Sequence, residues 1–222
     1  MDNYIHESRI GCVVVLGMHR SGTSLVAGLL QRLGVNMGTR FREPDRHNPT
    51  GYFEDLDWRD LNKEILQLTG CSWYQPPTKE QILAVRERVG SGIRALVDAR
   101  NSTGQLWGWK DPRTCLTVEL IHPHLSNPLY INVSRDRKAV VASLEARAKL
   151  RGYHEPRNHW YNLIDEYTER KLNFIVQNRA AFYSVNYNVL LEETGEIVRE
   201  LAEMVGQRDN KIINTAVNLV RK

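Results

Sequence analysis

The sequence predicts an α/β fold in three layers, with a central, mainly parallel sheet flanked by helices. Short apolar segments alternate with segments of helical period along the chain. The first of them, CVVVL at residues 12–16, is apolar throughout, as expected of a strand buried on both faces. A length of 222 residues suits one domain with a sizeable core. We therefore expect a single domain over residues 1–222, with peripheral tails at residues 1–10 and 208–222.

The composition narrows the possible functions. The formal net charge of +4 agrees with an anionic ligand, but the excess is too small and too scattered to indicate nucleic-acid binding. No apolar run reaches the length of a membrane span, because His19 and Arg20 interrupt the longest candidate. The first ten residues are too polar for a signal peptide. Since the 3 cysteines lack metal-ligand spacing, we expect reduced thiols in a cytoplasmic protein.

Residues 17–24, GMHRSGTS, predict an anion-binding loop. They separate the first strand from a helix that begins at Thr23 and repeats its apolar residues on one face. The backbone N–H groups of such a loop, together with the helix N-terminus, bind phosphate or sulfate groups. The two glycines match the Walker A spacing, but Thr23 stands in place of the lysine, and Arg20 supplies the positive charge instead. The fold is therefore expected to be P-loop-like, and a modified P-loop for some other phosphate is the alternative.

The rest of the chain predicts further strands and helices. We expect an irregular loop at 34–52, helices at 56–68, 78–99, 137–150, 158–179 and 189–205, and strands at 105–110, 128–134 and 181–187. A charged loop over residues 147–158 can cover the site as a lid. The aromatic and proline-rich segment at 73–77 either lines an acceptor pocket or caps the core. His122 and His124 lack an acidic or cysteine partner nearby, so no metal site is expected.

Three candidate site residues lie at or shortly after the ends of two of these strands. Lys110 ends the 105–110 strand, at the edge of the sheet where α/β proteins bind ligands, although a surface lysine at a turn is the alternative. Arg135 ends the 128–134 strand, and Ser143 follows about two helical turns later, so both can face one crevice. A guanidinium fork and a hydroxyl are suitable donors for a phosphate group.

These motifs resemble those of sulfotransferases that use 3′-phosphoadenosine 5′-phosphosulfate (PAPS). Residues 20–24, RSGTS, resemble the family's 5′-phosphosulfate loop, and residues 48–54, NPTGYFE, resemble a segment of bacterial members. Arg135 and Ser143 resemble its 3′-phosphate motif, although Arg137 replaces the common proline. Tyr187 stands in a segment where the family's tyrosine lies near the adenine. Lys110 resembles the lysine of tyrosylprotein sulfotransferases that contacts the transferring sulfuryl group.

The resemblance implies a PAPS-dependent sulfotransferase that needs no metal. It would move a sulfuryl group to the hydroxyl or amine of a small-molecule, carbohydrate or peptide acceptor and release adenosine 3′,5′-bisphosphate (PAP). The residues implied for PAPS binding are Arg20, Ser21, Gly22, Thr23, Ser24, Arg135, Ser143 and Tyr187. A P-loop nucleotide kinase and a non-catalytic nucleotide-binding protein are the rival functions. A kinase would normally have the Walker A lysine, which this loop lacks, and the sequence shows no clear acidic residue at the end of a strand to hold Mg²⁺.

Arg20 and Lys110 are the residues implied for charge stabilisation, and the general base is a choice among four. Glu43 has a spacing from Arg20 close to that of the glutamate used by tyrosylprotein sulfotransferases. Glu54 follows Tyr52 and Phe53, which can desolvate a carboxylate and raise its pKa toward a useful base. His19 lies in the phosphate loop, where a side chain can face away from the acceptor, and His154 lies in the expected lid. We favour Glu54, whose alternative role is to sit at the N-terminus of the 56–68 helix.

Overall fold

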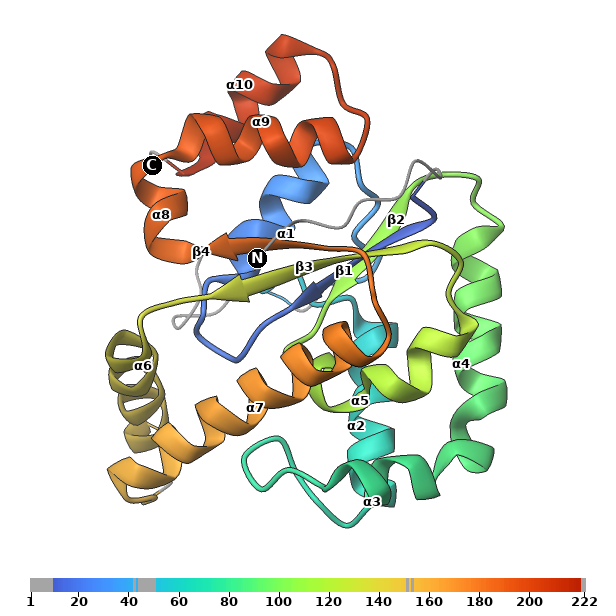
Figure 1. Cartoon of the computed structure of the whole chain (residues 1–222), viewed down its shortest axis with the longest axis vertical. Coiled ribbons are helices and arrows are strands. Elements are labelled where there is room, and N and C mark those ends of the chain that lie inside the picture. The colour runs from blue at the N-terminus through green and yellow to red at the C-terminus, as the bar shows by residue number, and fades with distance from the viewer. Residues whose placement is uncertain (1–9, 42, 44–50, 151, 153, 221–222) are drawn as a thin grey trace.

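The computed structural model describes residues 10–41, 43, 51–150, 152 and 154–220, and these residues contain one parallel sheet (Figure 1). Its strands are β1 (Cys12–Leu16), β2 (Trp107–Lys110), β3 (Pro128–Ser134) and β4 (Phe182–Asn186), in the order β2-β1-β3-β4. Val15 pairs with Lys110 on one side and with Ile131 on the other. The carboxyl ends of β1, β2 and β3 therefore lie at the same edge of the sheet.

Helices cover both faces of the sheet, and Figure 1 shows the two helical layers above and below it. One face carries α1 (Thr23–Arg32), α8 (Tyr187–Glu192), α9 (Thr194–Met204) and α10 (Asn210–Val220). The other carries α2 (Leu56–Leu68), α3 (Lys79–Ala84), α4 (Arg86–Asn101), α5 (Thr114–Ile121), α6 (Arg137–Leu150) and α7 (Arg157–Gln177), with a short 3₁₀ helix η1 (His122–His124). The predicted three-layer α/β fold is confirmed.

β1 lies between the two hydrophobic cores and contributes side chains to both. Val13 and Val15 pack into the core under α1, whereas Val14 and Leu16 pack into the core under α5 and α7. Every residue of β1 is buried. An apolar strand with no polar face can be accommodated only between two helical layers, and this burial is what the sequence predicted for it.

Two predicted helices are divided in the structure. The expected 78–99 helix consists of α3 and α4, because Val85 leaves the helical conformation with φ −94° and ψ 5°. The expected 189–205 helix consists of α8 and α9, separated by Glu193 with φ −112° and ψ 36°. α8 begins earlier than predicted, because the Asn186 side chain caps it by accepting from the N–H groups of Asn188 and Val189.

The C-terminal residues correct the prediction of a peripheral tail at 208–222. Residues 210–220 form α10, whose Ile213, Ala216 and Val217 are buried against α1 and α9. These three apolar residues are spaced three and four positions apart, so they lie on one face of the helix and can dock together. The expected tail at residues 1–9 lies outside the described residues.

The segment expected to form a lid, residues 147–158, also differs from the prediction. Residues 147–150 are the last turn of α6, and α7 begins at Arg157, so the connection between them is shorter than predicted. Residues 151 and 153 of this connection lie outside the described part of the chain.

Among the residues that the structure describes, every helix is either too short or too polar to cross a membrane.

Candidate active site

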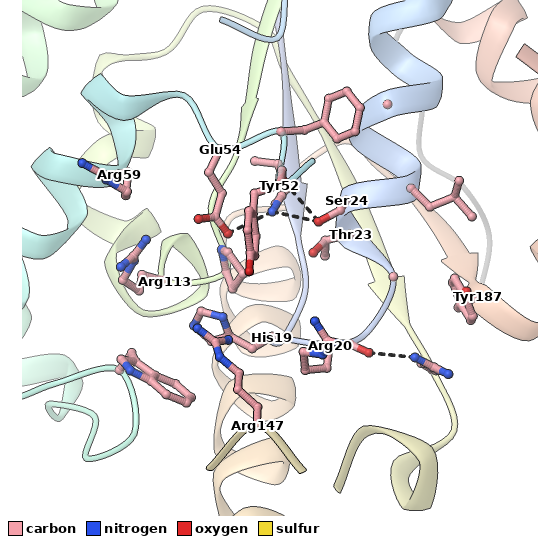
Figure 2. Close-up of a pocket in the computed structure, with 18 of the residues that line it drawn as sticks. His19, Arg20, Thr23, Ser24, Tyr52, Glu54, Arg59, Arg113, Arg147 and Tyr187 are labelled. Atoms are coloured by element: carbon pink, nitrogen blue, oxygen red, sulfur yellow. Dashed lines mark hydrogen bonds and ion pairs between the residues drawn. The ribbon is translucent and has the colours of Figure 1, made fainter. Parts of the chain in front are cut away.

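A cavity of about 820 Å³ opens where the carboxyl ends of β1 and β2 meet α1, α2 and α6. Its wall includes the phosphate loop, residues 52–54, the connection from β2 to α5, and parts of α8 and α10. Figure 2 shows the phosphate-loop residues in the middle, with Arg59 and Arg113 on one side of them and Tyr187 on the other. We call the Tyr187 side, where the sequence predicts binding of the sulfuryl donor, the donor end, and the side of Arg59, Arg113 and Arg147, which is left for the predicted acceptor, the acceptor end.

The phosphate loop turns sharply so that the start of α1 faces the cavity. Arg20 and Gly22 take left-handed φ angles of 71° and 93°. Ser21 fixes the turn, because its Oγ donates to the Met18 carbonyl at 2.6 Å. Gly22 occupies the N-cap position of α1 and has no side chain to cap it. No side chain caps the N-terminal N–H groups of α1, and a helix N-terminus of this kind is suited to bind an anion.

The two predicted phosphate motifs contact each other. Arg135 Nη1 donates to the Arg20 carbonyl at 3.2 Å, and Arg20 Nε donates to Ser143 Oγ at 2.7 Å. The Arg135 guanidinium also lies 4.6 Å from the centre of the Tyr187 ring. A Cβ at Gly22 would lie 2.1 Å from Tyr187, so only glycine allows this tyrosine to pack on the loop. Residues far apart in the sequence thus form one cationic, aromatic donor end.

A buried ion pair lies between the two ends. Lys110 Nζ is 3.1 Å from Glu54 Oε1, and these side chains are only 1% and 6% exposed. Lys110 also donates to Ser24 Oγ at 3.3 Å, which ties the pair to the first turn of α1. Asp55, not Glu54, caps α2 by accepting from the Asp57 N–H group. Glu54 is therefore directed into the cavity (Figure 2).

A model of known protein families matches this chain with the description "Sulfotransferase family", over residues 12–210. The chain is a member of the sulfotransferase family. This membership confirms the family and the enzyme class that the motifs predicted. It also weighs against the nucleotide kinase considered as a rival.

Solved structures of bacterial sulfotransferases have the same fold. Sulfotransferase STF1 from Mycobacterium tuberculosis H37Rv matches with a TM-score of 0.56 and 15% identity, over 95% of this chain and 71% of that one. The sulfotransferase domain from the curacin biosynthetic pathway gives 0.56 and 17%, over 93% and 77%. The sulfotransferase domain of the Synechococcus PCC 7002 olefin synthase gives 0.54 and 16%, over 96% and 78%. No curated protein matches this sulfotransferase in sequence.

The candidate bases of this sulfotransferase differ in position. Glu54 and His19 line the cavity, whereas Glu43 and His154 are exposed and do not appear among the described residues of its wall. The choice of base stays a prediction, and the cavity geometry favours Glu54. Residues 48–50, the first part of the NPTGYFE segment, lie outside the described residues.

His19 faces the cavity, although its loop position suggested that it can face away. Its ring makes an edge contact with Trp73, with 4.5 Å between ring centres. Its buried Nε2 has no hydrogen-bond partner among the described residues. Burial lowers the pKa of His19 well below its ordinary value, and the positive charges of Arg147 and Arg113 lower it further. His19 is therefore a neutral imidazole at neutral pH.

The sequence analysis pointed to the Trp73 segment as one wall of an acceptor pocket but did not single out Arg113 or Arg147 as site residues. Arg113 is buried and fixed by Asp111, with Nε and Nη2 each donating at 2.8 Å. The Arg147 guanidinium lies 5.6 Å from the centre of the Trp73 ring, so this tryptophan lines the cavity as well as packing on the core. Only the position of Arg113, directly after the Asp-Pro step, hinted at a role.

The described residues contain no group of three or more His, Cys, Asp or Glu side chains placed to hold a metal ion. His122, half of the histidine pair noted in the sequence, has its Nδ1 2.7 Å from the Tyr130 hydroxyl. The ring of Phe174 also makes an edge contact with it, at 5.2 Å between ring centres. These contacts give His122 a structural role.

Proposed function

We propose that this sulfotransferase moves a sulfuryl group from PAPS to the hydroxyl or amine of an acceptor and releases PAP. The observation that carries the proposal is the contact between two phosphate motifs from separate parts of the chain. Arg135 donates to the Arg20 carbonyl, and Arg20 donates to Ser143. A nucleotide with phosphate groups at both the 3′ and the 5′ positions needs two such motifs side by side, whereas a simple nucleoside monophosphate needs one.

The donor end fits the chemistry of PAPS. The phosphosulfate group would meet the N-terminal N–H groups of α1, offered by Gly22, Thr23 and Ser24. Arg135 and Ser143 would hold the 3′-phosphate, because a guanidinium gives a fork of charged donors and a hydroxyl adds a neutral one. Tyr187 packs against Gly22 and would contact the adenine.

The ion pair between Lys110 and Glu54 would serve the transfer step. The acceptor oxygen attacks sulfur, the bond from sulfur to the 5′-phosphate oxygen breaks, and the acceptor proton passes to Glu54. Lys110 and Arg20 would stabilise the negative charge that grows on the leaving phosphate oxygen. Because Glu54 Oε1 lies 3.1 Å from Lys110 Nζ, the base and the charge-stabilising ammonium meet at one point of the cavity.

We further propose that the protein acts as a single domain in the cytoplasm. The contacts of α10 with α1 and α9 support one compact unit. Cys12, Cys71 and Cys115 are all free thiols, which supports a reducing compartment.

A transfer assay tests the proposed function against its rivals. Labelled PAPS is incubated with the protein and a panel of hydroxyl and amine acceptors, with a metal chelator present. We expect labelled sulfate on at least one acceptor and an equal yield of PAP. Mg²⁺-dependent phosphate transfer from ATP would instead support a phosphotransferase. Tight binding of PAP with no turnover of PAPS on any acceptor would support a non-catalytic binding protein.

A further inference from the structure

The cavity wall has a large excess of positive charge. Among the described residues that line it, 7 are Lys or Arg and only Glu54 is acidic. Three of the basic residues, Arg20, Lys110 and Arg135, belong to the proposed PAPS site. The other four, Arg59, Lys63, Arg113 and Arg147, lie beyond that site at the acceptor end. The donor therefore accounts for fewer than half of the basic residues.

Two helices and one loop bring these four side chains together. Arg59 and Lys63 are one turn apart on α2, so they point in the same direction. Arg113 follows β2, and Arg147 lies in the last turn of α6. Arg113 and Arg147 both line the cavity, so they face one space although they come from different elements.

Acidic residues pair with three of these four basic side chains, Arg59, Lys63 and Arg113. Asp60 pairs with Arg59 at 2.7 Å and lies 3.8 Å from Lys63, and its own side chain is 57% exposed. Asp111 pairs with Arg113 through Nε and Nη2. Within the described part of the chain, Arg113 Nη1 has no hydrogen-bond partner. Asp111 thus fixes the guanidinium plane and leaves one edge for a ligand.

The surroundings favour an anionic ligand. Trp73 adds an aromatic side chain to the cavity wall, with the His19 ring at 4.5 Å and the Arg147 guanidinium at 5.6 Å from its ring centre. The unpartnered, neutral Nε2 of His19 can form one further hydrogen bond with a ligand. Glu54 does not repel an anion strongly, because the Lys110 ammonium is 3.1 Å away.

We propose that the acceptor of this sulfotransferase carries an oxyanion, a carboxylate, phosphate or sulfate group, which binds Arg113 and Arg147 beside Trp73 while its hydroxyl or amine faces Glu54. This inference rests on the proposed function. Arg59 and Lys63 add charge at the entrance. An acceptor without an anionic group would desolvate the buried Arg113 further and give its Nη1 no charged partner, so it would bind more weakly.

Small aromatic probes test the oxyanion site without a known acceptor. With saturating PAP at the donor end, the binding of benzoate, phenyl phosphate, phenyl sulfate and neutral benzamide is measured by ligand-observed NMR at fixed ionic strength. We expect at least one of the anions to bind about tenfold or more tightly than benzamide. Arg147→Gln and Arg113→Gln should each remove most of this preference. The ranking of the three anions identifies the oxyanion.

A matched control separates a specific site from general charge attraction. Arg94, exposed on α4, does not line the cavity, so Arg94→Gln removes the same charge and should leave the preference unchanged. Equal binding of benzamide and all three anions, or equal losses in all variants, overturns the oxyanion site while leaving the proposed function intact. Failure of PAP itself to bind overturns both.

Discussion

The two ends of the cavity are built in different ways. The donor end depends on the backbone: a left-handed turn at Arg20, the start of α1 and the carboxyl end of β3. The acceptor end depends on side chains that converge from α2, α6 and the connection after β2. If the proposed sites are right, the geometry of the sheet edge sets nucleotide binding, and the identity of a few side chains sets the choice of acceptor. Substitutions at the two ends should have separable effects.

The buried pair of Lys110 and Glu54 joins the two ends, and breaking it should give the largest effect. Lys110→Met keeps the volume but removes the ammonium from a carboxylate that is 6% exposed. Loss of one partner of a buried pair costs about 3 to 5 kcal/mol. We expect urea denaturation to show this decrease in the free energy of unfolding. The double variant Lys110→Met/Glu54→Gln should regain part of it, because no charge is then left buried. A decrease below about 1 kcal/mol would mean that the pair is solvated.

Glu54→Gln tests whether the chemistry can be separated from nucleotide binding. The amide keeps a hydrogen-bond acceptor for Lys110 but cannot take the acceptor proton. With any working acceptor, kcat should fall by about a hundredfold or more, while the affinity for PAP stays nearly unchanged. Glu43→Gln is the matched control, since Glu43 is exposed and outside the described cavity wall. Normal turnover of the Glu54 variant with an inactive Glu43 variant would identify Glu43 as the base.

The smallest expected effect is that of His19 on the pH dependence of the free energy of unfolding. Its pKa in the folded protein lies well below the ordinary 6.5, so the unfolded chain binds more protons as the pH falls below that value. The folded state should therefore lose stability from about pH 6.5 downward, by at most about 1.4 kcal/mol per pH unit from this group. His19→Gln should reduce this slope by one proton, as measured by urea denaturation at several pH values. Identical slopes in the two proteins would place His19 in contact with water.

The donor end could be predicted because its residues form contiguous motifs. A glycine-bounded loop after an apolar strand, and an arginine and a serine after another strand, are readable in the order in which they occur. The parallel sheet then brings Arg20 and Arg135 together, since β1 and β3 are neighbours. The fold class was predictable for the same reason, from apolar strands alternating with helices.

Apart from the aromatic segment at 73–77, the acceptor end could not be predicted, because no local pattern links its residues. Arg113 precedes α5 and Arg147 lies on α6, and only the folded arrangement of these elements places both in the wall of one cavity. The left-handed φ of 71° at Arg20, the residue after His19, was equally unpredictable, because residue propensity does not predict it for an arginine. The burial of α10 is a different case, because the sequence contains its apolar period. The sequence analysis nevertheless expected a peripheral tail there.

The central claim is that two phosphate motifs form one site for a 3′,5′-bisphosphate. Calorimetry with PAP and with 5′-AMP, in the presence of a metal chelator, tests it most directly. We expect PAP to bind much more tightly than 5′-AMP. Because a charge-assisted contact contributes about 1.5 to 3 kcal/mol, Arg135→Ala should weaken PAP binding by about ten- to a hundredfold and leave 5′-AMP nearly unaffected. Equal affinities for the two nucleotides, or tight binding of ATP only with Mg²⁺, would contradict the account.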